Sequence, residues 1–138
     1  MKCTISGSFR KFHAEILRAY DVFDNNGISV LAPRKSEAKN PGAELILLET
    51  DPSGATVKQI EDAHLAAIAA SNFLYVVNPG GYIGPSVTLE MGYAHGLKKP
   101  IFSSDLPSDH ALKAYITEVR STQDMCDYCK DFTKHRML

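Results

Sequence analysis

Residues 71–101 read SNFLYVVNPGGYIGPSVTLEMGYAHGLKKPI. The run Phe73–Val77 is continuously apolar, as expected for a parallel strand that is covered on both faces. Asn78–Pro85 holds three glycines and two prolines, which predicts a loop. Ser86 can cap a helix that runs to about Leu97. A strand, a Gly-rich loop and a helix in this order are typical of an α/β protein.

The remainder of the chain alternates in the same way. Strands are predicted at about 3–6, 28–33 and 100–104, and helices at about 12–23, 57–70 and 110–119. Ser53 and Thr56 are candidate caps of the helix at 57–70. Segment 34–42 is polar and is predicted to be a loop, whereas 44–49 (ELILLE) fits either a short strand or a helical turn. This alternation predicts a parallel sheet with helices on both faces, and ligands in such folds bind beyond the carboxyl ends of the strands.

Composition limits the class of protein. The 138 residues fit one domain, with a core over about residues 1–120 and a C-terminal tail at 121–138. Hydrophobic residues make up 44% and charged residues 22%, which is ordinary for a soluble globular protein. The net charge of −1, without a Lys/Arg cluster, argues against nucleic acid as the main partner. No apolar run is long enough to span a membrane, no signal-peptide core is visible, and three cysteines make no disulfide framework. We therefore expect a cytoplasmic protein.

The loop before Ser86 has the features of an anion site. Free backbone N–H groups at a helix N-terminus, together with the helix dipole, favour negative charge there. Ser86 could give its hydroxyl to a phosphate, or it could only cap the helix. Glu90 lies one turn further on, among apolar or small residues. A carboxylate in such surroundings is a candidate functional group, although a solvated helix glutamate is the alternative.

The segment quoted above resembles the nucleoside 2-deoxyribosyltransferase superfamily, including its nucleotide N-glycosidase branch. The resemblance lies in the apolar strand, the Gly/Ser loop, the EMGYA sequence that contains Glu90, and the Lys-Lys-Pro turn into the next strand. The N-terminal sequence ISGSFR (residues 5–10) is similar to the first strand and Gly-Ser turn of that family.

The resemblance implies a flavodoxin-like or Rossmann-like three-layer sandwich with a parallel sheet of about five strands. It implies an enzyme that cleaves the bond between a base and C1′ of ribose or deoxyribose, with Glu90 as the nucleophile and without a cofactor or a metal. The residues implied to hold the nucleoside or its 5′-phosphate are Gly7, Ser8, Phe9, Arg10, Gly81, Gly84 and Ser86.

The family usually has an Asp on the helix before the central strand, and the matching position here is His64. Apolar residues of this helix share a face with His64, whereas Asp62 lies about 160° away at ~100° per residue. His64 is therefore expected to point inward and Asp62 outward. An imidazole can protonate a leaving base, so we expect His64 to be the acid; a core histidine bonded to the backbone is the alternative.

Other assignments remain open from the sequence. The sequence Pro79-Gly80-Gly81 with Glu90 is similar to the loop of the lysine-decarboxylase-like phosphoribohydrolases, and a non-catalytic nucleotide-binding module is a third possibility. The pair Cys126 and Cys129, with His135 nearby, lacks the second pair of ligands that a structural zinc site needs unless another chain supplies it. Two thiols on a terminal amphipathic segment, without a metal or redox role, are the alternative. The apolar face of Leu89, Tyr93 and Leu97 predicts a homodimer or larger assembly.

Overall fold

The computed structural model describes residues 1–33 and 56–136, and the predicted segments at 34–42 and 44–49 and the candidate cap Ser53 lie outside these ranges. Within the described ranges, five parallel strands form one sheet in the order β2-β1-β3-β4-β5. The strands are β1 (Lys2–Gly7), β2 (Ser29–Ala32), β3 (Phe73–Val77), β4 (Ile101–Ser103) and β5 (Glu118–Val119). The helices are α1 (Phe9–Asn25), α4 (Val57–Ala70), α5 (Pro85–Gly96), α6 (His110–Lys113) and α7 (Thr122–Arg136), with a 3₁₀ turn, η1, at Pro79–Gly81.

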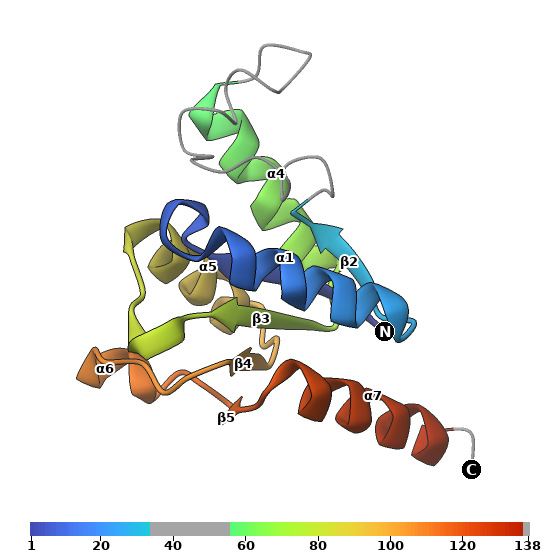
Figure 1. The fold of residues 1–138 in the computed structure, drawn as a ribbon. Helices are drawn as coiled ribbons and strands as arrows, with labels where there is room; N and C mark the ends of the chain where they lie inside the picture. Colours follow the sequence, from blue (N-terminus) through green and yellow to red (C-terminus); the bar gives the residue numbers. More distant parts are fainter. Residues whose placement is uncertain (34–55, 137–138) are drawn as a thin grey trace.

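Helices cover the sheet on both faces, with α1 and α7 on one side and α4 and α5 on the other (Figure 1). This arrangement confirms the predicted α/β sandwich with a parallel sheet of about five strands. Among the described helices, none combines the length and the hydropathy that crossing a membrane requires.

Successive side chains of β1 alternate between apolar residues on one face of the sheet and polar residues on the other. Cys3 and Ile5 belong to the apolar cluster beneath α1 and α7. Thr4 hydrogen-bonds Ser71 at the end of α4, and Ser6 hydrogen-bonds His64 of α4. Because successive side chains of a strand point to opposite faces, the polar residues of β1 all face α4 and α5.

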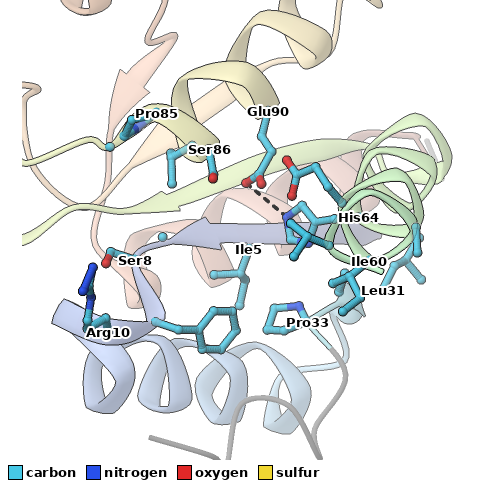
Figure 2. Close-up of a pocket in the computed structure, with 18 of the residues that line it drawn as sticks. Ile5, Ser8, Arg10, Leu31, Pro33, Ile60, His64, Pro85, Ser86 and Glu90 are labelled. Carbon is cyan, nitrogen blue, oxygen red and sulfur yellow. Dashed lines mark ion pairs between the residues drawn. The ribbon is translucent and has the colours of Figure 1, made fainter. Parts of the chain in front are cut away.

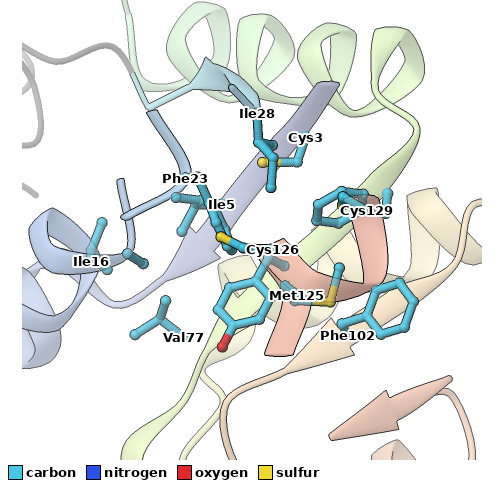
Figure 3. Packing of buried hydrophobic residues seen from close by; sticks show 13 residues of the cluster. Cys3, Ile5, Ile16, Phe23, Ile28, Val77, Phe102, Met125, Cys126 and Cys129 are labelled. Carbon is cyan, nitrogen blue, oxygen red and sulfur yellow. The ribbon is translucent and has the colours of Figure 1, made fainter. Parts of the chain in front are cut away.

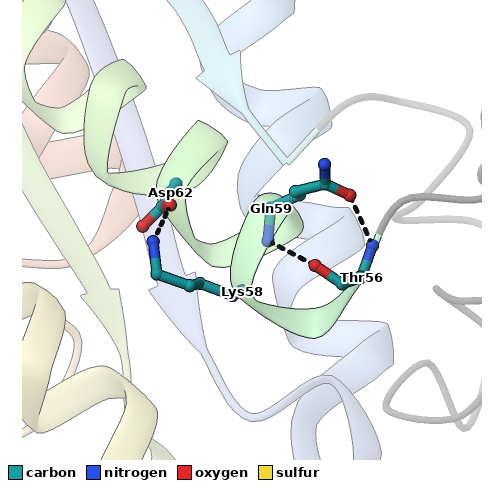
Figure 4. Close-up of polar contacts among 4 residues, drawn as sticks. All are labelled: Thr56, Lys58, Gln59 and Asp62. Carbon is teal, nitrogen blue, oxygen red and sulfur yellow. Dashed lines mark hydrogen bonds and ion pairs between the residues drawn. The ribbon is translucent and has the colours of Figure 1, made fainter.

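The helix α4 begins and ends where the sequence predicts. Thr56 accepts a hydrogen bond from the Gln59 backbone N–H at 3.2 Å, and the Gln59 side chain accepts one from the Thr56 N–H at 2.8 Å (Figure 4). This reciprocal capping box satisfies two donors that a helix N-terminus leaves open. It fixes the first turn of α4, the turn that precedes Glu61 and His64.

Two predictions about the C-terminal third are wrong. The predicted helix at 110–119 ends at Lys113, and Glu118–Val119 forms the edge strand β5. The segment at 121–138, predicted to be a tail, contains α7, whose Met125, Cys126 and Cys129 are buried in the core (Figure 3). The core therefore extends past residue 120, because α7 covers sheet surface that would otherwise be exposed.

Candidate active site

A pocket of about 460 Å³ lies beyond the carboxyl ends of β1 and β2, between α4 and the N-termini of α1 and α5 (Figure 2). The strand order reverses between β1 and β3, because β2 lies on one side of β1 and β3, β4 and β5 lie on the other. Ligands of α/β folds bind at such a reversal. The apolar part of its wall includes Ile5, Leu31, Ala32, Pro33, Val57 and Ile60. The polar part includes Ser8, Arg10, Gln59, Glu61, His64, Ser86 and Glu90.

Glu90 reaches this pocket from the buried face of α5. Val87 and Ala94, three residues before it and four after it, pack against the sheet. Because residues three and four apart share a helix face, Glu90 points inward with them. Its side chain is only 7% exposed, and its Oε1 lies 3.4 Å from Nε2 of His64. His64 Nε2 also lies 3.2 Å from Oγ of Ser6, so that β1, α4 and α5 each contribute one member of this group.

The surroundings of Glu90 favour its ionised form. Burial alone acts to raise the pKa of the Glu90 carboxyl. Hydrogen bonds from His64, Glu61 and Ser6, together with the charge of His64, outweigh burial and lower that pKa below its ordinary value. Glu90 is thus a largely buried carboxyl group whose surroundings favour the carboxylate form.

Glu61 is the functional candidate that sequence reasoning missed. It lines the same pocket and hydrogen-bonds Glu90. Burial, the hydrogen bond to Glu90 and the charge of Glu90 raise the pKa of Glu61 to about 8. The signal was present in the sequence: Glu61 lies three residues before His64, about 60° from it around the helix at ~100° per residue.

The other acidic residue of this turn behaves as predicted. Asp62 points to solvent and pairs with Lys58 at 2.6 Å, four residues earlier (Figure 4). The helix therefore presents two adjacent carboxylates to opposite environments, one in the pocket and one in water.

The N-termini of α1 and α5 lie at the end of the pocket away from Leu31 and Ile60 (Figure 2). Ser8 caps α1, where its Oγ accepts a hydrogen bond from the Lys11 backbone N–H, and Arg10 follows in the first turn. At α5 the predicted cap is wrong: Gly84 is the N-cap and Pro85 takes the first helical position, which proline favours. Ser86 is exposed, and its hydroxyl has no hydrogen-bond partner among the described residues. Its hydroxyl is thus available to a ligand.

The structure brings most of the predicted binding residues to this pocket, with one exception. Gly7, Ser8, Phe9, Arg10, Gly84 and Ser86 all line it, together with Glu90 and His64. Gly81 does not; a Cβ there would lie 2.7 Å from the Leu106 carbonyl oxygen, and its φ is +90°. Gly81 therefore serves the turn after β3, and the backbone N–H of Gly80 is already occupied by the Asp105 carboxylate.

Tyr82 borders the pocket beside these N-termini. Its ring meets Phe12 edge-on, and Lys11 Nζ lies 4.4 Å from the ring centroid. Tyr82 thereby connects the loop after β3 to the first turns of α1. Tyr82 therefore joins the pocket wall to α1.

The cysteines lie away from this site, on the other face of the sheet. Cys3, Cys126 and Cys129 are all buried and all carry free thiols. Burial raises the pKa of each thiol, that of Cys129 to about 11. Within the described residues no group of side chains is arranged to hold a metal ion. The thiols act there as small apolar core residues.

No family model matches the sequence, and no curated protein matches it either. Among solved structures the chain is similar to the CMP N-glycosidase BcmB of Clostridium botulinum, with a TM-score of 0.58, 10% identity and coverage of 96% of this chain and 99% of that chain. It is also similar to the 2-deoxyribosyltransferase of Bacillus psychrosaccharolyticus, with a TM-score of 0.62, 15% identity and coverage of 93% and 92%. The chain has the nucleoside 2-deoxyribosyltransferase-like fold. That is the fold which the EMGYA segment and its preceding loop predicted, and at these identities the likeness concerns the fold alone.

Proposed function

We propose that this nucleoside 2-deoxyribosyltransferase-like protein cleaves or transfers the N-glycosidic bond of a nucleoside or a nucleoside 5′-monophosphate, with Glu90 as the nucleophile. The observation that carries the proposal is the state of Glu90, a buried carboxylate that hydrogen bonds keep ionised where it lines the pocket. A nucleophilic carboxylate needs that state, since only the anion attacks an electrophilic carbon. The enzymes named as structural neighbours act on bonds of this class, which supports the proposal.

The two ends of the pocket suit the two ends of a nucleotide. Apolar side chains such as Leu31, Pro33 and Ile60 offer a surface for a planar base. Arg10, Ser86 and the two helix N-termini offer donors for a 5′-hydroxyl or a phosphate. A nucleotide bound in this direction places its sugar between the two ends, with C1′ toward Glu90.

The proposed reaction has two halves. An oxygen of Glu90 attacks C1′ while the bond from C1′ to the base nitrogen breaks, which leaves a glycosyl ester on Glu90. Water, or the nitrogen of a second base, then attacks C1′ and releases Glu90. The departing base requires a proton, and the pocket contains two candidate donors, His64 and Glu61.

A product assay with the Glu90→Gln variant tests this proposal. The amide has nearly the same shape as the carboxylate but is a poor nucleophile, so we expect turnover to fall by about 10³-fold or more with the fold retained. The assay incubates wild type and variant with a panel of nucleosides and their monophosphates and measures free base by chromatography. Asp62→Asn, the same type of change on the solvent face of α4, is the matched control and should keep full activity.

Near-full turnover by a folded Glu90→Gln protein would overturn the assignment of the nucleophile. Binding of nucleotides by the wild type without release of any base would instead favour the non-catalytic binding module.

Cytoplasmic location and self-association stay predictions. Leu89, Tyr93 and Leu97 of α5 are between 38% and 55% exposed, so the apolar face that suggested a homodimer lies on the surface of the chain. Light scattering distinguishes a dimer from a 15.2 kDa monomer directly.

A further inference from the structure

Two carboxyl groups and one imidazole meet in the pocket, and they cannot all have the same role. Resting on the function proposed above, we propose that Glu61, and not His64, gives its proton to the leaving base. In the same assignment His64 is a positioning residue that holds Glu90 as an anion in the correct orientation. This division follows from the contacts of the two side chains and from the charges around Glu61.

His64 is directed at the nucleophile. The same nitrogen, Nε2, lies 3.4 Å from Glu90 Oε1 and 3.2 Å from Ser6 Oγ. A proton on Nε2 therefore stabilises the Glu90 carboxylate or bonds the Ser6 hydroxyl. His64 thus contacts the nucleophile and Ser6 through one nitrogen, a placement that suits it to orient Glu90.

Glu61 also contacts Glu90, but it is an acid whose second oxygen has no donor within the described part of the chain. Its Oε1 is buried, and no donor of the described residues reaches it, whereas its carboxyl is hydrogen-bonded to that of Glu90. Two carboxylates accept hydrogen bonds but cannot donate them, so this contact requires a proton on one of the two groups. A protonated Glu61 supplies the missing hydrogen itself.

The charges around Glu61 place the shared proton on it. Burial and Glu90 of α5 favour the neutral form of Glu61, Asp62 of α4 does so more weakly, and His64 opposes them. These influences raise the pKa of Glu61 to about 8, whereas the donors around Glu90 lower the pKa of that carboxyl. Two carboxyl groups whose pKa values are driven apart are suited to act as acid and nucleophile.

With Glu61 as the acid, the proton and the electron pairs of both halves of the reaction are accounted for. In the first half an oxygen of Glu90 bonds to C1′, the electron pair of the C1′–N bond goes to the base, and the Glu61 proton moves to the base. Glu61 is then a carboxylate. In the second half it takes a proton from the attacking water, the water oxygen bonds to C1′, and the ester bond to Glu90 breaks. Glu61 ends protonated and Glu90 ends ionised, as at the start.

Substrates that differ only in their need for a proton test the assignment. One is a nucleoside 5′-monophosphate that the wild type cleaves; the other is the 4-nitrophenyl glycoside of the same 5-phosphorylated sugar, whose phenolate leaves without protonation. For Glu61→Gln we expect a loss of about 10²–10⁴-fold on the nucleotide and less than about tenfold on the nitrophenyl compound. For His64→Gln we expect a similar loss on both, because Glu90 is disturbed whichever group leaves.

Two further variants serve as controls. Asp62→Asn removes an adjacent carboxylate on the solvent face and should leave both rates unchanged. Glu61→Asp restores an acid, so it should recover part of the nucleotide rate and keep the decline of that rate as pH rises above about 8. If Glu61→Gln does not fold, the comparison of Glu61→Asp with wild type on the two substrates decides the question.

The outcomes separate the two proposals. A selective loss on the nucleotide in His64→Gln, or equal losses on both substrates in Glu61→Gln, would overturn the assignment of the proton to Glu61 while leaving Glu90 as the nucleophile. Failure of Glu90→Gln to affect either substrate would overturn the proposed function, and the role of Glu61 would fall with it.

Discussion

The two faces of the sheet bury different chemistry. Beneath α1 and α7 the buried side chains are apolar, and Phe23 lies at their centre with its ring edge-on to Phe73 and Tyr75 at 6.3 and 5.1 Å. The phenol of Tyr75 is satisfied by the Arg120 carbonyl at 2.8 Å. Beneath α4 and α5 the apolar cluster is smaller, and Ser6, His64 and Glu90 lie beside it. The larger apolar cluster thus lies on one face, and the ionisable groups of the pocket lie on the other.

The largest effect on stability should come from the apolar face. Phe23→Ala removes a fully buried ring that contacts two others, and we expect it to lower the free energy of unfolding by about 3–5 kcal/mol. The protein that remains folded should keep its turnover number, since Phe23 does not line the pocket. Denaturant unfolding and an assay corrected for the folded fraction measure both quantities. A loss of less than about 1 kcal/mol would contradict the division of the two faces.

A smaller effect, of the opposite sign, is expected from the polar face. Between about pH 4.5 and about pH 8 the unfolded chain releases the Glu61 proton and the folded protein retains it, so stability falls as pH rises through this window. Glu61→Gln removes this dependence and should be at least as stable as wild type at pH 8. Glu90 acts in the other direction, since its lowered pKa adds stability that is lost as pH falls through the acid range. Thermal unfolding measured from pH 4 to 9 follows both trends, with Asp62→Asn as the control. If the stability of Glu61→Gln falls with rising pH as steeply as that of the wild type, the trend assigned to Glu61 is refuted.

Local sequence patterns were sufficient for most of the fold. The apolar run Phe73–Val77 and the cap at Thr56 gave correct bounds for β3 and for α4. The strand β5 could not be predicted, because two exposed residues carry no periodicity and form a strand only by pairing with β4. Pro85 displaced the predicted cap from Ser86 to Gly84, since proline prefers the first helical position.

The candidate site was predictable in part. Glu90 and the inward direction of His64 follow from helix periodicity and apolar neighbours. Glu61 lies about 60° from His64 around the helix at ~100° per residue, but a helix glutamate is ordinarily exposed, so periodicity alone does not mark it as a pocket residue. No sequence pattern shows that Glu61 and Glu90, which are 29 positions apart in the chain, share a hydrogen bond. That contact arises from the packing of α4 against α5.

The central claim is that Glu90 forms a covalent bond to the sugar, and trapping that ester tests it most directly. A nucleotide fluorinated at C2′ of its sugar slows the second half of the reaction, because the electronegative fluorine destabilises the positive charge that develops at C1′. Mass spectrometry of the digested protein should then show one added sugar phosphate on the peptide that contains Glu90, and none in Glu90→Gln. Release of base from the wild type without any such adduct, or an adduct on another residue, would contradict the account.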